Sequence, residues 1–339
     1  MPHPHQAAPL NAAILGLGWW GRTVVDTMRG SDAMRVTTGF DPNPAAAALA
    51  AEAGLRLAPS FEAVLADPEI GAVVLCTPHT LHAAQIVQAA RAGKHVFCEK
   101  PLCLTRADAA AAIAACREAG VVLGVGHERR FEPPVLELRR VLDSGELGTP
   151  LQIEANFSQD KFLALPADNW RLSPAEAPAG PMTATGIHLL DLAISLLGPA
   201  ERVLAHVRQL GSGLANGDTL ALAVQFRTGA NALISAILAT PFDGRFAVYG
   251  SKGWAEVRDK AHPERPEGWT LMKAIRGEDR STAEFPPAPA VRANLDAFAA
   301  AAVGGPAYPV PLVQMLDTVA VFEAVVRSSR SGGIERVEI

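Results

Sequence analysis

The chain has 339 residues and a mass of 35.6 kDa; 49% of its residues are hydrophobic, 19% are charged, and its net charge is −5 at pH 7. This composition excludes a disordered or fibrous chain, and the length predicts two domains that each bury a core. The basic residues are scattered, so the sequence offers no basic patch for nucleic acid or for an anionic membrane.

The sequence also carries no targeting or membrane signal. The first ten residues, MPHPHQAAPL, lack the charged and apolar segments of a signal peptide, and no apolar run is long enough to span a bilayer. The four cysteines match no zinc-binding spacing and are too few for a disulfide scaffold. We therefore expect reduced thiols and a cytoplasmic protein.

Strands and helices alternate through the first third of the chain. Short apolar runs ending near turns predict strands at 11–15, 34–40, 72–76, 95–98 and 121–126. The segments between them, at 22–29, 44–54, 81–93 and 105–120, are compatible with helices, and the last three end in glycine. Apolar strands separated by helices are typical of a doubly wound parallel sheet, which predicts a Rossmann dinucleotide-binding domain over residues 1–126.

The remaining residues, 127–339, predict a second α/β domain. A helix at 133–144 is followed by longer strands with a period of two, at 219–226 and 230–240, and the chain ends in two helices. Leu220, Leu222 and Val224 face one way, whereas the opposite face carries Ala221 and Ala223. This second face is small and largely apolar, so we expect a partner subunit to cover it. Cover by helices of the same domain is the alternative.

A glycine-rich loop follows the first strand and opens a helix. Its sequence, Gly-Leu-Gly-Trp-Trp-Gly, is the G-x-G-x-x-G pattern of dinucleotide-binding sites. Gly16 permits the tight turn, Gly18 lets the backbone approach a pyrophosphate, and Gly21 allows close packing of helix and strand. The phosphates are expected on the amides of the helix N-terminus. Trp19 and Trp20 either border the cofactor or pack against the second domain.

Asp41 ends the second predicted strand, 20 residues after the last glycine of the loop. A carboxylate at this position bonds the 2′-hydroxyl of the adenosine ribose and repels a 2′-phosphate. We therefore expect NAD in preference to NADP. Capping of the turn before Pro42 is the alternative role for Asp41.

Glu99, Lys100 and Pro101 end another predicted strand, where residues of a doubly wound sheet face the ligand crevice. With this element included, the sequence resembles the Gfo/Idh/MocA oxidoreductases. The resemblance rests on AAILGLGWWG, VVLCTPHTLH, AGKHVFCEKPL, GHERRF and GIHLLDLAISLLG, which occur in the family's order and spacing. It implies a Rossmann domain followed by an α/β domain with an open, mostly antiparallel sheet that joins subunits into a homodimer or homotetramer.

The resemblance also assigns roles to individual residues. It implies that Lys100 contacts both substrate and cofactor, and that Thr77, Pro78 and His82 lie beside the nicotinamide ribose. It maps the family's later histidine onto His188, with Asp191 three residues further along, and both are candidate substrate ligands. Many members carry an aspartate four residues before that histidine, where this sequence has Ala184.

Two residues are the candidate catalytic groups. His188 can accept the proton of an alcohol near neutral pH because the ordinary pKa of histidine is about 6.5. Lys100 then orients and polarises the oxygen, although it is also a possible base. The alternative for His188 is a buried histidine at a helix start, and for Asp191 a structural carboxylate. Glu99 is included among the cofactor-binding residues with Lys100.

Three further residues are candidate substrate ligands. Trp170 and Arg171 offer an aromatic face and a guanidinium, which suit a sugar; Arg129 begins the second domain. Salt bridges are the alternative for Arg129 and its neighbour Arg130.

We therefore predict an NAD-dependent oxidoreductase acting on a secondary alcohol or ketone of a sugar, cyclitol or related ring. The alternatives are an NAD-dependent glycosidase on the same fold and a non-catalytic NAD-sensing regulator.

Overall fold

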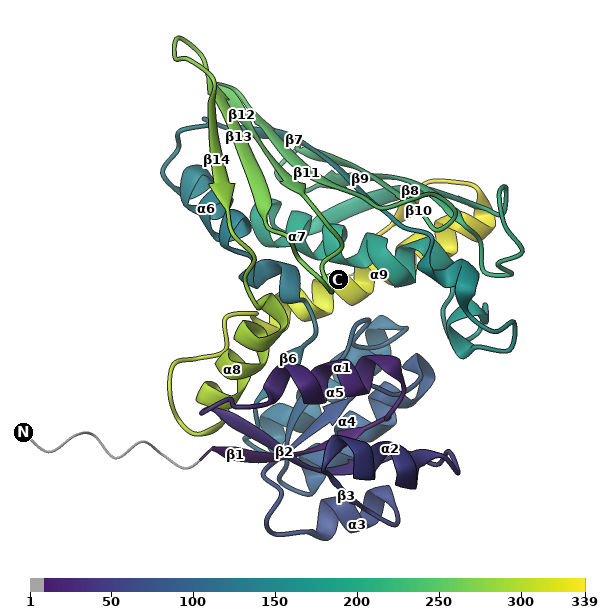
Figure 1. Cartoon of the computed structure of the whole chain (residues 1–339). Helices are drawn as coiled ribbons and strands as arrows, with labels where there is room; N and C mark the ends of the chain where they lie inside the picture. The colour runs from purple at the N-terminus through teal and green to yellow at the C-terminus, as the bar shows by residue number, and fades with distance from the viewer. Residues whose placement is uncertain (1–8, 339) are drawn as a thin grey trace, which may run out of the picture. The chain divides into compact units, whose positions relative to one another are not determined.

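The computed structural model describes residues 9–338, and the chain forms two compact units (Figure 1). The first unit contains the residues up to Cys103, then Ala107–Glu128 and Pro289–Leu312; the second contains Leu104–Arg106, Arg129–Ala288 and the residues from Val313 onward. The sequence predicts a single boundary at residue 126 and no return of the chain to the first unit at 289–312. That boundary stays a prediction. The interpretation of the first residues as lacking a signal peptide falls on 1–8, outside the described residues.

The first unit is a six-stranded parallel sheet in the order β3-β2-β1-β4-β5-β6. Its strands are β1 (Leu10–Leu15), β2 (Met34–Phe40), β3 (Arg56–Leu57), β4 (Ala72–Leu75), β5 (His95–Cys98) and β6 (Leu123–Val125). Its helices are α1 (Trp19–Met28), α2 (Ala46–Ala53), α3 (Phe61–Ala66), α4 (His82–Arg91), α5 (Arg106–Glu118) and α8 (Ala290–Ala302), with a short turn η1 (His79–Leu81) before α4. The predicted doubly wound parallel sheet is confirmed.

The apolar strands of this sheet are buried because helices cover both of its faces. Every residue of β4 is buried. On β6, Gly124 leaves room for the Phe298 ring of α8: a Cβ at this position would lie 2.8 Å from a ring carbon. This close approach fixes the late helix α8 in the core of the first unit.

The second unit is a nine-stranded sheet in the order β14-β13-β12-β11-β7-β10-β9-β8-β15. Its strands are β7 (Pro150–Ser158), β8 (Ala200–Arg208), β9 (Thr219–Phe226), β10 (Asn231–Ile237), β11 (Asp243–Gly250), β12 (Gly253–Asp259), β13 (Trp269–Ile275), β14 (Ser281–Phe285) and β15 (Glu335–Arg336). The helical segments are η2 (Glu128–Phe131), α6 (Pro133–Asp143), η3 (Lys161–Ala164), η4 (Trp170–Leu172), η5 (Met182–Gly186), α7 (Ile187–Leu197) and α9 (Leu312–Ser331). Among the described strands of this sheet, only the β7–β10 pair runs parallel, which confirms the predicted mostly antiparallel sheet.

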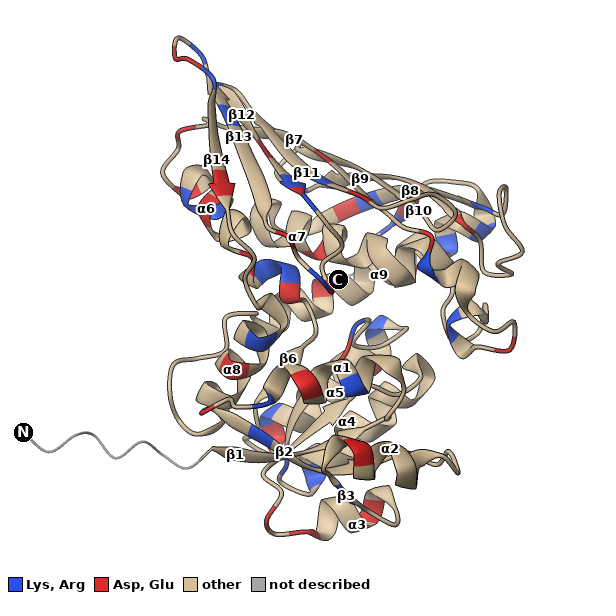
Figure 2. Ribbon diagram, viewed as in Figure 1, with Lys and Arg blue, Asp and Glu red and all other residues tan. Residues whose placement is uncertain are grey.

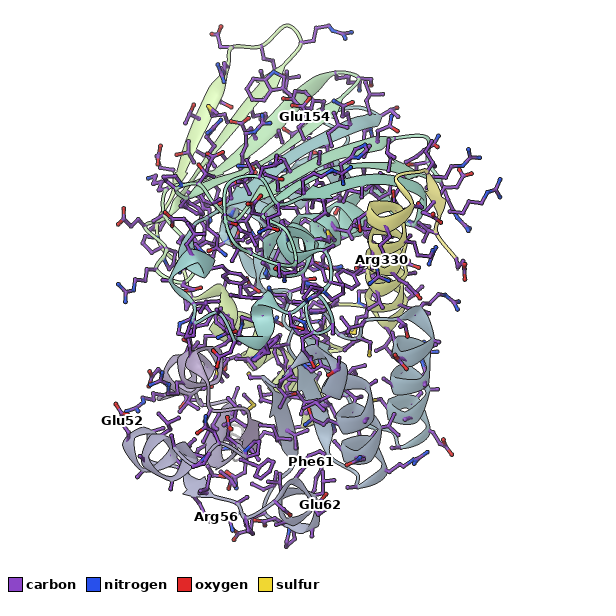
Figure 3. The ribbon with its side chains drawn as sticks, turned by 90° about the vertical axis from the view of Figure 1, so that its right-hand side faces the viewer. Glu52, Arg56, Phe61, Glu62, Glu154 and Arg330 are labelled. Carbon is purple, nitrogen blue, oxygen red and sulfur yellow. The ribbon has the colours of Figure 1, made fainter. Side chains whose placement is uncertain are left out.

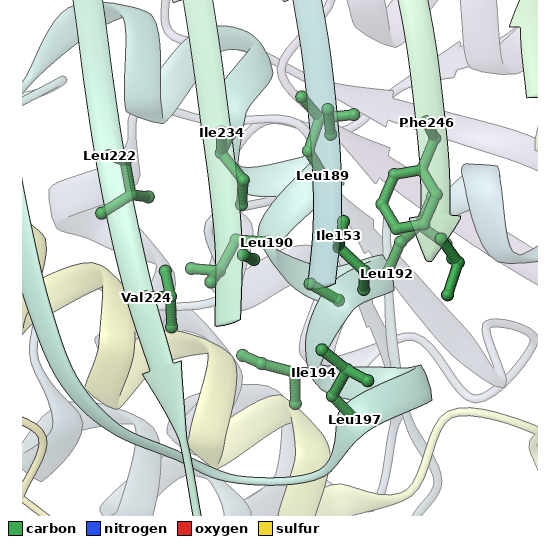
Figure 4. Close-up of a cluster of buried hydrophobic side chains, with 14 of the residues drawn as sticks. Ile153, Leu189, Leu190, Leu192, Ile194, Leu197, Leu222, Val224, Ile234 and Phe246 are labelled. Carbon is green, nitrogen blue, oxygen red and sulfur yellow. The ribbon is translucent and has the colours of Figure 1, made fainter. Parts of the chain in front are cut away.

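One face of this sheet packs on helices and forms the core of the second unit (Figure 4). Leu222 and Val224 of β9 and Ile234 of β10 meet the apolar side chains of α7, including Leu190 and Ile194. The period-two pattern of the sequence thus assigned the inward face of β9 correctly. Helix α7 is apolar on nearly all sides because it is itself covered, with ten of its eleven residues buried.

The opposite face of the sheet is mixed in character. Toward β9 and β10 it carries Ala221, Ala223 and Leu233, the last 47% exposed. Toward β7, β11 and β12 it carries a charged ladder in which Arg245 pairs with Glu154 at 3.5 Å and with Glu256 at 3.3 Å (Glu154 is labelled in Figure 3). The predicted small, largely apolar face is therefore limited to the β9–β10 side.

Within residues 9–338, no helix is long and apolar enough to cross a bilayer. Charges of both signs are interspersed along the chain (Figure 2). All four cysteines are free thiols, and burial raises the pKa of Cys103 to about 12 and that of Cys116 to about 11. These two thiols therefore stay protonated near neutral pH and are poor nucleophiles.

Candidate functional site

The glycine loop between β1 and α1 has the local geometry of a phosphate-binding turn. Gly16 has a φ of +92°, and a Cβ there would lie 2.5 Å from the Cys76 carbonyl oxygen. A Cβ on Gly21 would lie 1.9 Å from the Gly16 oxygen, whereas the space around Gly18 is open to 4 Å. Helix α1 also has no capping side chain and no acidic residue in its first turn. Its N-terminal amides therefore fit a pyrophosphate.

Asp41 lies directly beside this loop. Its Oδ2 accepts the backbone N–H of Leu17 at 2.7 Å, and its Oδ1 accepts that of Asn43 at 2.9 Å. The capping role considered from the sequence is thus realised. A carboxylate oxygen has more than one acceptor position, so both oxygens retain capacity for a ribose hydroxyl. Asp41 therefore organises the glycine loop and offers a ribose ligand from the same position.

The two tryptophans after the loop have different surroundings. Trp20 packs against the apolar core of the first unit, and its indole Nε1 is buried without a hydrogen-bond partner in the described chain. Trp19 is 44% exposed and lies 5.5 Å from the Trp20 ring between centroids. Trp19 therefore has the larger surface for a ligand, whereas Trp20 packs against the core.

The turns after β4 and β5 carry the remaining cofactor candidates. The Thr77 hydroxyl donates to Gln85 Oε1 of α4 at 2.6 Å, and Pro78 precedes η1. The buried Glu99 carboxylate accepts the backbone N–H of Lys100 at 3.3 Å. A Cβ on Gly126 would lie 2.5 Å from the Glu99 carboxylate, so Glu99 packs tightly against the end of β6. This packing makes Glu99 a support for Lys100.

His82 has backbone partners on both sides of its ring. Its ring is fully buried, and both ring nitrogens contact backbone carbonyl oxygens, those of Pro101 and Thr77. A ring bound on both sides offers no nitrogen to a ribose hydroxyl. The two contacts give His82 a structural role in supporting the two turns, and the cofactor contact implied by the resemblance stays a prediction.

His188 is the second residue of α7 and is 6% exposed. Its ring centroid lies 6.1 Å from that of Phe157 at the end of β7. The five residues just before α7, Met182–Gly186, form a single π-helical turn, a feature that is frequent at functional sites. Ala184 belongs to this turn and packs against a small cluster around Leu172 and Leu238. The position of the family's aspartate is thus apolar in this chain.

Asp191 and Arg129 are both engaged in buried ion pairs, and their expected roles as substrate ligands stay predictions. Both oxygens of Asp191 accept hydrogen bonds of 2.6 Å from the Arg130 guanidinium, and Asp191 is 1% exposed. Arg129 is 2% exposed; it binds both oxygens of Asp259 at 2.7 Å and pairs with Glu132 at 3.2 Å. Buried charges are stable when paired in this way. These groups hold the second unit together and are not exposed for substrate.

Trp170 and Arg171 form η4 and contact each other. The Arg171 guanidinium lies 4.2 Å from the centre of the Trp170 ring, so it covers part of the aromatic face expected to bind a sugar. The Arg171 carbonyl accepts a hydrogen bond from Asn216 at 2.8 Å. The pair is held in place, and both side chains are only partly buried.

A further histidine that contacts Phe157 had no signal in the sequence. The ring of His262, in the β12–β13 loop, lies 5.8 Å from Phe157, and its Nε2 lies 2.6 Å from Gln159 Oε1. Its Nδ1 lies 3.0 Å from the Lys161 ammonium. These contacts join residues about 100 positions apart, so neither periodicity nor motif spacing could have found them.

Comparisons with known proteins identify both parts of the chain. Residues 10–127 match the model described as "Oxidoreductase family, NAD-binding Rossmann fold", and residues 135–256 match the "GFO/IDH/MocA C-terminal domain". The chain belongs to the Gfo/Idh/MocA oxidoreductase family. Its first unit is accordingly an NAD-binding Rossmann domain, and the protein is an enzyme of the oxidoreductase class.

Several named sugar and inositol oxidoreductases are similar to this chain. A 1,5-anhydro-D-fructose reductase of Ensifer adhaerens is 33% identical over 69% of this chain and 71% of its own length. A scyllo-inositol 2-dehydrogenase (NAD(+)) of Bacillus subtilis is 32% identical over 72% of each chain. The crystal structure of an aldose-aldose oxidoreductase from Caulobacter crescentus, complexed with glycerol, has a TM-score of 0.85 at 27% identity and covers 97% of this chain and 99% of its own.

The Asp41 geometry predicts the cofactor preference of this Gfo/Idh/MocA enzyme. We expect NAD to bind more tightly than NADP, because the carboxylate repels a 2′-phosphate. In Asp41→Ser/Pro42→Arg the preference should relax, and NAD affinity should also fall about tenfold because Leu17 loses its carboxylate partner. Fluorescence titration with both cofactors measures this. Asp26→Ser, which removes an exposed carboxylate of α1, is the control; equal affinities of the unaltered enzyme for NAD and NADP would refute the assignment.

The apolar setting of Ala184 predicts the effect of restoring the family's carboxylate. In Ala184→Asp, a negative charge about one helical turn from His188 favours the imidazolium, so the acid limb of kcat/KM for alcohol oxidation should move to higher pH by up to about one unit. Burying the carboxylate among leucines should also cost on the order of 1–3 kcal/mol of stability. Ala184→Asn has nearly the same shape without the charge and should leave the limb in place. If the acid limbs of Ala184→Asp and Ala184→Asn lie at the same pH, the proposed titration of His188 is contradicted.

Proposed function

We propose that this enzyme transfers a hydride between NAD and a secondary alcohol or ketone of a sugar, cyclitol or related polyhydroxylated ring. The observation that carries the proposal is the edge of the parallel sheet, where the glycine loop, the Thr77 turn and the Glu99-Lys100 turn follow adjacent strands β1, β4 and β5. The carboxyl edge of a doubly wound sheet is where dinucleotides bind. Relatives named as an anhydro-fructose reductase and an inositol dehydrogenase support the substrate class.

In this proposal cofactor binding, proton transfer and substrate binding are divided among the following residues. The cofactor-binding residues are Gly16, Gly18, Gly21 and Asp41, with Trp19 at the loop border and Thr77 and Pro78 at the β4 turn. When bound, the nicotinamide ring supplies the hydride acceptor or donor. His188 takes the hydroxyl proton during oxidation and returns it during reduction, and Lys100 donates a hydrogen bond to the same oxygen. Trp170 and Arg171 are the proposed substrate ligands of the second unit.

The division of labour follows the two parts of the chain. We propose that residues 1–126 bind the cofactor and that residues 127–339 bind the substrate and join subunits. The match of the NAD-binding family model to residues 10–127 supports the first assignment. Free thiols at all four cysteines support a reducing compartment such as the cytoplasm.

The experiment that tests the function is a screen of sugars, inositols and sugar acids with NAD, followed by NADH absorbance. Net NADH formation with one of these compounds supports the proposal. Glycoside cleavage without net change in NADH would instead indicate the NAD-dependent glycosidase, and cofactor binding with no turnover of any compound would indicate the NAD-sensing regulator.

We also propose that the β9–β10 side of the open sheet joins subunits into a homodimer or homotetramer. Exposed Leu233 beside Ala221 and Ala223 forms an apolar strip on a face that no described helix of the unit covers, and such strips typically mark interfaces. Ala221→Glu/Ala223→Glu should therefore yield monomers by light scattering. The control Thr282→Glu changes an exposed residue of β14 and should leave the mass unaltered. An unchanged mass for the double variant would place the interface elsewhere.

A further inference from the structure

His82 is the first residue of α4, and its imidazole is fully buried between two turns of the NAD-binding unit. Its Nδ1 lies 2.9 Å from the carbonyl oxygen of Pro101, and its Nε2 lies 3.1 Å from the carbonyl oxygen of Thr77. Both distances are those of ordinary hydrogen bonds. The ring therefore bridges the turns that follow β4 and β5.

The chemistry of these partners determines the charge of the ring. A carbonyl oxygen only accepts hydrogen bonds, and a neutral imidazole carries a single N–H. In either neutral tautomer one ring nitrogen would turn its lone pair toward a carbonyl oxygen in a site without solvent, which is unfavourable. Only the imidazolium, with an N–H on each nitrogen, donates to both carbonyls. The geometry thus favours a buried cation.

The bridge ends one residue away from Lys100. Pro101 follows Lys100 directly, while Thr77 is held independently by Gln85 of the same helix, α4. We propose that His82 is a positioning residue that, as a buried imidazolium, locks the Lys100 turn onto the Thr77 turn. Its effect on turnover rests on the role proposed above for Lys100, whereas its charge state does not.

The groups around the bridge are compatible with this charge. The titratable groups on these elements are His79 in η1, Cys76 directly after β4, Cys98 at the end of β5, and Glu99, Lys100 and Cys103 in the turn that follows β5. The His79 ring meets the His82 ring nearly edge-on at 5.6 Å between centroids. The Glu99 carboxylate belongs to the same turn. Its negative charge favours the positive charges of Lys100 and His82.

The charge state has a direct spectroscopic test. In the full-length protein labelled with ¹⁵N-histidine, we expect one imidazole with protons on both nitrogens at about pH 8, more than one unit above the ordinary histidine value. This signal should be absent from His82→Gln and from His82→Asn, which assigns it by two independent variants. A single protonated nitrogen in the signal so assigned would overturn the proposed cation.

The positioning role has a kinetic test. Glutamine can donate to only one of the two carbonyls, so His82→Gln should lower kcat about tenfold or more while the Kd for NAD changes less than about threefold. The matched control is His95→Gln: His95 begins β5, at the end opposite Lys100, and its Nδ1 accepts the N–H of Val122 at 3.0 Å. Its loss should destabilise the sheet without lowering kcat.

The outcomes separate this inference from the proposed function. If His82→Gln and His95→Gln lose stability and kcat equally, His82 is an ordinary structural residue and the inference is overturned. If Lys100 variants keep full turnover, the proposed function of Lys100 fails, and any loss in His82→Gln then has another origin. The spectroscopic result stands in either case, because it needs no substrate.

Discussion

Replacing Lys100 with methionine is expected to lower kcat about 10²-fold or more while the Kd for NAD stays within about tenfold. Methionine keeps the length of the side chain and removes its charge and its hydrogen-bond donors. The turn itself should persist, because the Lys100 backbone N–H is held by Glu99 and the next residue is held by His82. The change therefore removes chemistry with little change in structure. Stopped-flow NADH absorbance and cofactor titration measure the two quantities.

A second substitution at the same position separates two roles of the amine. Arginine keeps a positive donor but does not lose its proton in proteins. If Lys100 only polarises the oxygen, Lys100→Arg should recover part of the turnover lost in Lys100→Met. If Lys100 is the base, both variants should be equally slow. Full turnover in Lys100→Met would show that the lysine is structural.

The fold was predictable where the pattern was local. Apolar runs such as 72–75 are buried on both faces of a parallel sheet, and the inward residues Leu222 and Val224 follow from alternation alone. The return of α8 to the first unit was not predictable, because it depends on Gly124 leaving room for Phe298 across 174 positions of sequence. No local pattern records such a contact.

The site was likewise predictable where its residues form a continuous motif, and not where they meet from distant parts of the sequence. The glycine loop is a continuous motif, and its three glycines each meet the steric demand expected of them. The ion pair between Arg129 and Asp259 joins residues 130 positions apart. From the sequence alone, Arg129 was therefore as compatible with a substrate ligand as with a salt bridge. Likewise, the π-helical turn before His188 is a response to packing, and residue propensity does not specify it.

Substitution of His188 tests the other half of the proposed chemistry. His188→Asn should lower kcat for alcohol oxidation by about 10² to 10⁴, the contribution of a positioned general base. Asparagine is polar and smaller than histidine, and His188 packs beside Phe157 in a buried setting, so the variant keeps a polar group at the start of α7. NAD affinity should be nearly unchanged, because His188 belongs to the unit that does not carry the glycine loop.

The pH profile distinguishes a base from a packing residue. Oxidation needs the neutral imidazole, so the rate of the unaltered enzyme should fall as pH decreases and His188 becomes protonated. In His188→Asn this acid limb should disappear and leave a slow, flat profile, whereas His206→Asn, which removes an exposed histidine of β8, should retain both limb and rate. A limb that survives in His188→Asn would assign the titration to another group. Lys100 would be the first to test, since a lysine base also works only without its proton.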